Sequence, residues 1–62
     1  MMKSESLRNK ISKKVFIVMK SGWHYEGILN AVSDETAFIK DRFNEDVELD
    51  IVDISTVTVK HT

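Results

Sequence analysis

The sequence predicts an all-β domain in which a short N-terminal helix precedes a five-stranded, strongly bent antiparallel barrel. Short runs rich in Val, Ile, Phe, Trp and Tyr recur along the chain between polar turn residues, which is typical of half-buried strands. A Ser21-Gly22 turn separates the first two runs, and Gly27 lies inside the second run. A glycine within a strand usually marks a sharp bend or a close approach of two backbones. A long strand bent at its middle allows a small sheet to curl into a barrel.

The predicted helix spans residues 4–12. Ser4 is suited to the N-cap position, and Glu5 lies in the first turn, where a negative charge is favourable against the helix dipole. Leu7 and Ile11 are four positions apart and therefore share one face. Two apolar anchors do not stabilise an isolated helix, so we expect this face to pack against the barrel.

Strands are predicted at residues 15–20, 23–32, 36–41, 47–51 and 56–60. The first run is apolar on both faces, which indicates that both faces are covered. The fourth run alternates cleanly, with Val47, Leu49 and Ile51 directed inward and acidic residues between them. The links between the strands are short and polar, as expected for an antiparallel sheet.

A chain of 62 residues is expected to form one domain, with the helix at about 4–12 and the barrel at about 14–60. A domain of this size buries only about 60% of the surface that its unfolded chain exposes. Disulfides, a metal or oligomerisation usually supply the missing stability. The sequence has no cysteine, and its two histidines, His24 and His61, lie far apart without ligand spacing. Self-association is therefore the predicted remedy.

The hydropathy of the chain indicates a cytoplasmic protein without a membrane partner. No apolar run approaches the roughly 20 residues that are needed to cross a bilayer. The N-terminus is polar and lacks the apolar segment of a signal peptide.

Charge is distributed unevenly along the chain. The net charge is −1, but residues 1–14 carry +4 and residues 15–62 carry −5. Such asymmetry suggests a basic arm that meets a polyanion or the acidic body of a neighbouring copy. Four of the N-terminal cations lie at the end of the helix and the start of the first strand, and they form the first candidate site: Arg8, Lys10, Lys13 and Lys14. Their alternative role is solubility alone.

Aromatic residues supply the other candidates. Arg42 and Phe43 lie side by side in the loop before the fourth strand, where they could form a stacking pair for a base. Phe43 could instead cap the barrel or an interface, which is the reading that we favour. Trp23 and Tyr25 alternate in phase with Gly27, Leu29 and Ala31, so we expect core or subunit contacts for them rather than base stacking.

Nothing in the sequence indicates an enzyme. Acidic residues are numerous, but carboxylate chemistry also requires a pocket with shifted pKa values, which so small a barrel rarely encloses. The sequence has no nucleophile–base pair, no phosphate-binding glycine loop and no metal-ligand spacing, and no cofactor is expected.

The stretch VFIVMKSGWHYEGIL, with Gly22 in its turn and Gly27 at its bend, resembles the Sm-like (LSm/Hfq) family. The ending DISTVTV is similar to the closing turn and last strand of Hfq-type proteins, and the resemblance covers about Leu7 to Val59. It implies an SH3-like barrel that assembles as a homo-oligomeric ring of six or seven copies, in which the fourth strand pairs with the fifth strand of the next copy. It also implies RNA binding, often to uridine-rich single strands at the inner rim of the pore.

The chain holds the RNA-binding motifs of that family in degenerate form, at Ser33, Asp34, Ala37 and Asp50. Ser33 occupies a position that is usually Asp, and Ala37 one that is Asn in eukaryotic and archaeal Sm proteins. Asp50 lies where the family has an Arg-Gly or Lys-His pair, and an acid there repels a phosphate. We therefore expect an absent or altered uridine pocket. The basic helix end corresponds to the outer-rim arginine patch of Hfq-type proteins.

The predicted function is a non-catalytic ring protein that binds nucleic acid, RNA above all, as a chaperone-like platform. The predicted contacts are the four N-terminal cations together with Arg42 and Phe43. One alternative is a protein–protein assembly module that has lost RNA binding. A weaker alternative is a DNA-associated barrel regulator.

Overall fold

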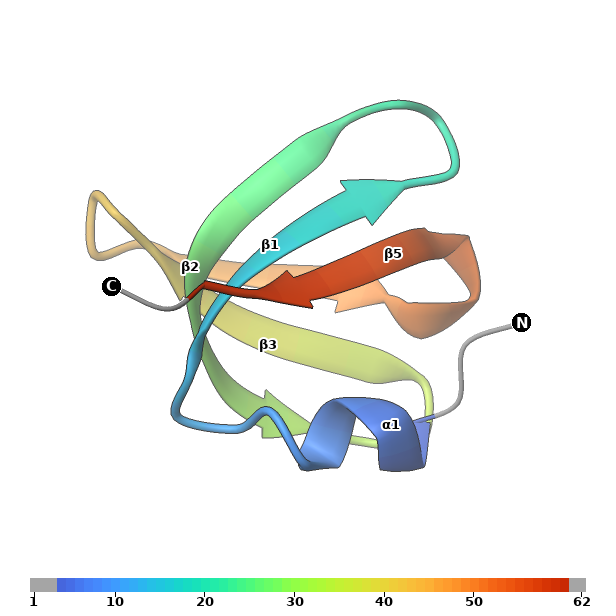
Figure 1. The fold of residues 1–62 in the computed structure, drawn as a ribbon, viewed down its shortest axis with the longest axis horizontal. Coiled ribbons are helices and arrows are strands. Elements are labelled where there is room, and N and C mark those ends of the chain that lie inside the picture. The colour runs from blue at the N-terminus through green and yellow to red at the C-terminus, as the bar shows by residue number, and fades with distance from the viewer. Residues whose placement is uncertain (1–3, 61–62) are drawn as a thin grey trace.

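A computed structural model of the chain describes residues 4–60 and shows a short helix followed by one strongly curved antiparallel sheet (Figure 1). The elements are α1 (Ser4–Arg8), β1 (Lys14–Met19), β2 (His24–Val32), β3 (Thr36–Asp41), β4 (Asp46–Asp50), the 3-10 helix η1 (Ile51–Asp53) and β5 (Ile54–Val59). The strand order is β4-β3-β2-β1-β5, so β4 and β5 are the two edges. The predicted mostly-β fold with an N-terminal helix is confirmed. The sheet curls as a barrel does but is not closed by hydrogen bonds between its edges.

The helix is shorter than the predicted span of residues 4–12. It ends at Arg8, and the chain then runs through turns to Ser12, whose φ is 74°. The N–H of Ser12 donates to the carbonyl of Leu29, at 2.7 Å, which draws the segment onto β2. Leu7 is fully buried and closes one end of the sheet, but Ile11 is exposed. The helix therefore supplies one apolar anchor instead of two.

Gly27 permits the sharp curvature of β2. This glycine pairs with Val15 of β1 on one side and with Asp41 of β3 on the other. A Cβ atom at position 27 would collide with the carbonyl oxygen of Lys40 and lie 2.9 Å from the Cα of Asp41. The predicted close approach of two backbones at this glycine is confirmed.

A register shift follows in the second half of β2. Leu29 pairs with Ile39, but the next pair is Ala31 with Phe38, so Asn30 is an extra residue in the ladder. A bulge of this kind reverses the alternation of side chains beyond it. Leu29 is buried whereas Ala31 is exposed. The prediction that Ala31 shares the inner face with Leu29 is therefore wrong.

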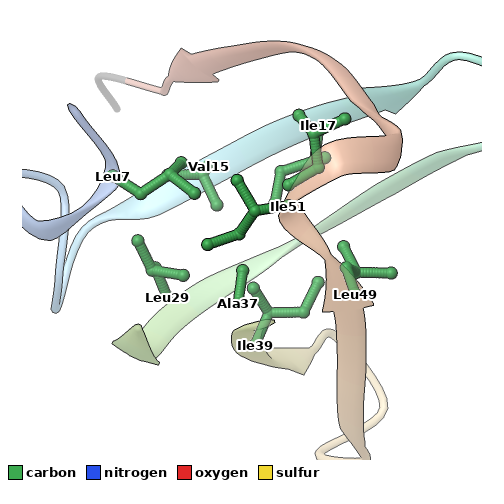
Figure 2. Close-up of a cluster of buried hydrophobic side chains, with 9 residues drawn as sticks. Leu7, Val15, Ile17, Leu29, Ala37, Ile39, Leu49 and Ile51 are labelled. Atoms are coloured by element: carbon green, nitrogen blue, oxygen red, sulfur yellow. The ribbon is translucent and has the colours of Figure 1, made fainter. Parts of the chain in front are cut away.

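The concave side of the sheet holds a wholly apolar core (Figure 2). Its nine buried residues come from the helix, all five strands and η1: Leu7, Val15, Ile17, Leu29, Ala37, Ile39, Leu49, Ile51 and Ile54. Among residues 4–60 no polar or charged residue is buried. The predicted inward direction of Leu49 and Ile51 is confirmed, although Ile51 belongs to η1.

Most strand bounds agree with the predictions to within one or two residues. Residues 36–41 are predicted as a strand, and β3 covers Thr36–Asp41. The turn after β4 is tighter than expected, because η1 lets β5 begin at Ile54, two residues before the predicted start. No helix of the described segment is long and apolar enough to span a membrane.

Candidate functional site

An open pocket of about 240 Å³ lies between β1, β2 and the loop that joins β3 to β4. Four rings, two carboxylates and one guanidinium line it: Phe16, His24, Tyr25 and Phe43, then Glu26 and Asp41, then Arg42. In Figure 1 the β3–β4 loop projects from the left side of the sheet. The residues of this pocket come from separate parts of the chain, and only folding brings them together.

Phe16 forms one side of the pocket. Val15 and Ile17 on either side of it are buried, so alternation directs the Phe16 ring to the outer face of β1. The centroid of the ring lies 5.3 Å from that of His24, and the two planes are inclined by 33°. The Nζ atom of Lys60 lies 5.6 Å from the centroid of the Phe16 ring, which is within the range of a cation–π contact.

Glu26 stands directly opposite Phe16 in the antiparallel ladder between β1 and β2. Its Oε2 atom lies 3.7 Å from the Nζ of Lys60, so one ammonium group faces both the ring and the carboxylate. The ordering of Lys60 follows from the backbone, because the Lys60 N–H donates to the Lys14 carbonyl at 2.8 Å and prolongs the pairing of β5 with β1. Three residues of this site were not predicted from the sequence: Phe16, Glu26 and Lys60. The signal that could have indicated them is the alternation of β1, which places the Phe16 ring on the outer face.

The loop after β3 presents the second ring. The Oδ1 atom of Asp41 accepts hydrogen bonds from the backbone N–H groups of Phe43 and Glu45, both at 2.9 Å. Asn44, with φ of 65°, completes this tight turn. The guanidinium carbon of Arg42 lies 5.1 Å from the centroid of the Phe43 ring. The predicted contact between Arg42 and Phe43 is therefore present.

Phe43 is 71% exposed, so the prediction that it caps the barrel is wrong. The loop is held by the carboxylate of Asp41 and projects away from the core, so the side chain that lies over the ring is Arg42 and not a core residue. A role for Phe43 at an interface between molecules stays a prediction.

Trp23 is also 71% exposed, and the prediction that it contacts the core is wrong. It lies in the β1–β2 turn, one residue before β2 begins and beyond the last pair of the β1–β2 ladder, and its carbonyl accepts from the N–H of Met19 at 2.7 Å. A subunit contact by Trp23 stays a prediction. Tyr25 does contact the core as predicted, and it also lines the pocket.

The N-terminal cations do not line the pocket. An Nη atom of Arg8 lies 3.3 Å from Oδ1 of Asp34, and the Lys10 ammonium donates to the Ser6 carbonyl at 2.9 Å. Lys13 and Lys14 are exposed. Lys14 lies two residues before Phe16 in β1 and therefore on the same outer face of the sheet. Of the four N-terminal cations, Lys14 is the one that belongs to β1 and shares a face with the pocket.

The four positions at which the sequence resembles the Sm-like motifs, Ser33, Asp34, Ala37 and Asp50, also lie outside the pocket. Ser33 shapes the turn between β2 and β3, since its Oγ accepts from the Thr36 N–H at 3.0 Å. Asp34 is engaged with Arg8, and Ala37 is fully buried in the core. Asp50 is exposed at the end of β4, opposite Thr36. These four positions present no cation and no aromatic ring to a ligand.

The described residues offer no group of three or more His, Cys, Asp or Glu side chains that could hold a metal ion. The pocket is lined by the rings of two aromatic–cation pairs, Phe16 with Lys60 and Phe43 with Arg42. Arg42 lines the pocket itself, whereas Lys60 lies beside it and contacts the half-buried Phe16 ring. Comparison of the chain with protein-family models, with curated proteins and with solved structures gave no match.

Proposed function

We propose that this chain is a non-catalytic protein with an Sm-like, SH3-like barrel that binds single-stranded nucleic acid, RNA above all, at the aromatic pocket. The observation that carries the proposal is that two rings of one open pocket, Phe16 and Phe43, are each paired with a cation. Proteins that hold single strands combine aromatic rings, on which bases stack, with cations that follow the phosphate backbone.

The chemistry of each pair fits one nucleotide. The ring of Phe43 is exposed on the β3–β4 loop and is free to stack on a base, while Arg42 beside it supplies a charge for the adjoining phosphate. Phe16 supplies a second, half-buried ring to the pocket, and Lys60 beside the pocket supplies its cation. Each stacked base contributes about 1–3 kcal/mol.

Assembly into a ring of six or seven copies is the second part of the proposal. Two sheet edges, β4 and β5, are left without a strand partner among residues 4–60. Unpaired edges are a hazard for aggregation, and pairing β4 with β5 of the next copy would remove both. A ring would also repeat the pocket around its circumference, so that weak contacts add up by avidity.

The test is fluorescence anisotropy with labelled single-stranded U-rich, single-stranded A-rich and duplex probes. We expect micromolar or tighter, salt-sensitive binding of a single strand, and a loss of roughly 5- to 150-fold in the Phe43→Ala variant, which removes one stacking ring. Trp23→Ala is the matched control, because Trp23 is equally exposed but does not line the pocket. Equal losses in both variants would contradict the assignment of the pocket.

The contribution of the N-terminal cations is tested by replacing Arg8, Lys10, Lys13 and Lys14 with Gln. We expect weaker binding and a flatter dependence of the affinity on salt, since each lost phosphate contact lowers the slope. If this variant bound RNA as tightly as the parent chain at low salt, the N-terminal cations would have no part in the site.

Light scattering after size-exclusion chromatography tests the proposed ring. A monomer at micromolar concentration would contradict the ring.

A protein–protein assembly module is the second candidate. It is favoured by Ala37, which is buried and offers a ligand nothing, and by Asp50, which presents a negative charge where the family has a cation. Absence of binding to every probe would support this candidate. Preference for the duplex probe would instead support a DNA-associated regulator.

A further inference from the structure

We propose that Glu26 and Lys60 read the edge of the base that stacks on Phe16, and that they select guanine over uracil. This inference rests on the proposed function and adds a specificity to it. It starts from the position of Glu26, whose side chain lines the pocket directly opposite Phe16 in the ladder of β1 and β2. Because Phe16 and Glu26 are cross-strand partners that line one pocket, a base stacked on Phe16 would present its edge to that carboxylate.

The two carboxylates of the pocket differ in what they already bind. Oδ1 of Asp41 accepts from two backbone N–H groups of its own loop, and this carboxylate serves to shape the turn. Among residues 4–60, no hydrogen bond is donated to the Glu26 carboxylate, and its ion-pair contact with Lys60 is long, at 3.7 Å. Glu26 therefore keeps its acceptor capacity for a ligand.

The hydrogen-bonding pattern of Glu26 and Lys60 decides which base fits. An ionised carboxylate only accepts hydrogen bonds, and an ammonium only donates them. The Watson–Crick edge of guanine presents the O6 acceptor followed by two adjacent donors, N1–H and the 2-amino group. The ammonium of Lys60 can donate to O6, and the two carboxylate oxygens of Glu26 can accept from N1–H and from the 2-amino group. Guanine therefore satisfies both side chains at once.

Uracil fits the same pair poorly. Its edge has one N–H, at N3, between two carbonyl oxygens. When one oxygen of the Glu26 carboxylate accepts from N3–H, the other oxygen faces a carbonyl oxygen of uracil and has no donor. Adenine and cytosine each present a single amino group beside an acceptor and are intermediate. A site built to hydrogen-bond a donor rejects the analogue that lacks it, because a polar group is left unpaired.

The experiment uses four single-stranded RNA nonamers of uridine that differ at the central position, which is U, A, C or G. A single guanine per probe avoids guanine quadruplexes. With the full chain we expect the G probe to bind roughly 5- to 150-fold more tightly than the all-U probe, the range for one bidentate contact to a base. In Glu26→Gln this ratio should fall toward one, since an amide both donates and accepts.

Glu48→Gln is the matched control. It removes the same negative charge from an exposed residue of β4 outside the pocket, so it raises affinity for all four probes alike and keeps the G-to-U ratio. Because the readout is a ratio measured on one protein, a change in the folded fraction of a variant does not alter it.

Three results would overturn the inference. If the parent chain bound all four probes equally and with salt dependence, the proposed function would stand and the guanine specificity would fall. A G preference that survived in Glu26→Gln would show that another residue reads the base. No binding of any probe would remove both the specificity and the proposed function.

Discussion

The two faces of the sheet are built from different chemistry. The inner face carries nine buried apolar residues and, in the described part of the chain, no buried polar group (Figure 2). The outer face carries the ion pair of Glu26 with Lys60 and the ring–cation pair of Phe16 with Lys60, all within reach of solvent. The comparison teaches that stability and the proposed binding depend on opposite faces of the same strands. Substitutions should therefore separate the two properties.

The largest expected effect on folding is at Gly27, where the backbones of β2 and β3 approach each other closely. Both faces of the sheet need this approach, because it sets the curvature of β2. Gly27→Ala places a methyl group against the backbone at Lys40 and Asp41, which cannot rotate away as a side chain would. Overpacking usually costs 1–3 kcal/mol, and we expect about 3 kcal/mol or more here. Much of the stability expected of so small a domain would be lost. Urea denaturation followed by circular dichroism measures the change.

Gly22→Ala is the control for Gly27→Ala. Gly22 has φ of +99°, but no atom of residues 4–60 beyond its chain neighbours lies within 4 Å of the position that its Cβ would take. The cost is then backbone strain alone, about 1–2 kcal/mol. Equal urea midpoints for the two variants, measured at one protein concentration, would mean that the close approach at Gly27 does not limit the fold.

A pair of isoleucines compares the faces directly. Ile39 on the inner face of β3 is 1% exposed, whereas Ile28 on the outer face of β2 is 40% exposed. Ile39→Ala should lower the free energy of unfolding by about 2–5 kcal/mol, because it leaves a cavity in the core. Ile28→Ala should cost about 1 kcal/mol or less, since half-exposed residues bury little extra surface. Similar losses, measured by urea denaturation, would show that the outer face is covered in solution, as in an oligomer.

The inner face was largely predictable from the sequence, because alternation is a local property. The clean pattern of β4 places Leu49 inward, and the structure agrees. The predictions that Ala31 and Trp23 face the core were wrong for local reasons that the alternation of residues does not reveal. The bulge at Asn30 turns Ala31 outward, and Trp23 lies in the β1–β2 turn before β2 begins, where its side chain is exposed.

The candidate site was only half predictable. Arg42 and Phe43 are neighbours in the chain, so their contact follows from sequence alone. Phe16 and Lys60 meet because β1 lies beside β5, a pairing between strands distant in the sequence. Runs of alternating residues do not state which strands are neighbours, and so the second ring–cation pair could not be read from them.

The smallest expected effect concerns the exposed ion pair of Arg8 and Asp34, whose side chains are 47% and 93% exposed. Pairs in water contribute little, because solvent and salt screen them. Asp34→Asn should therefore change the free energy of unfolding by less than about 0.5 kcal/mol. The same change releases Arg8 for phosphate, so RNA affinity at low salt should rise while stability stays constant. A loss of more than about 1 kcal/mol in the free energy of unfolding, measured by urea denaturation, would instead show that the ion pair of Arg8 with Asp34 stabilises the fold.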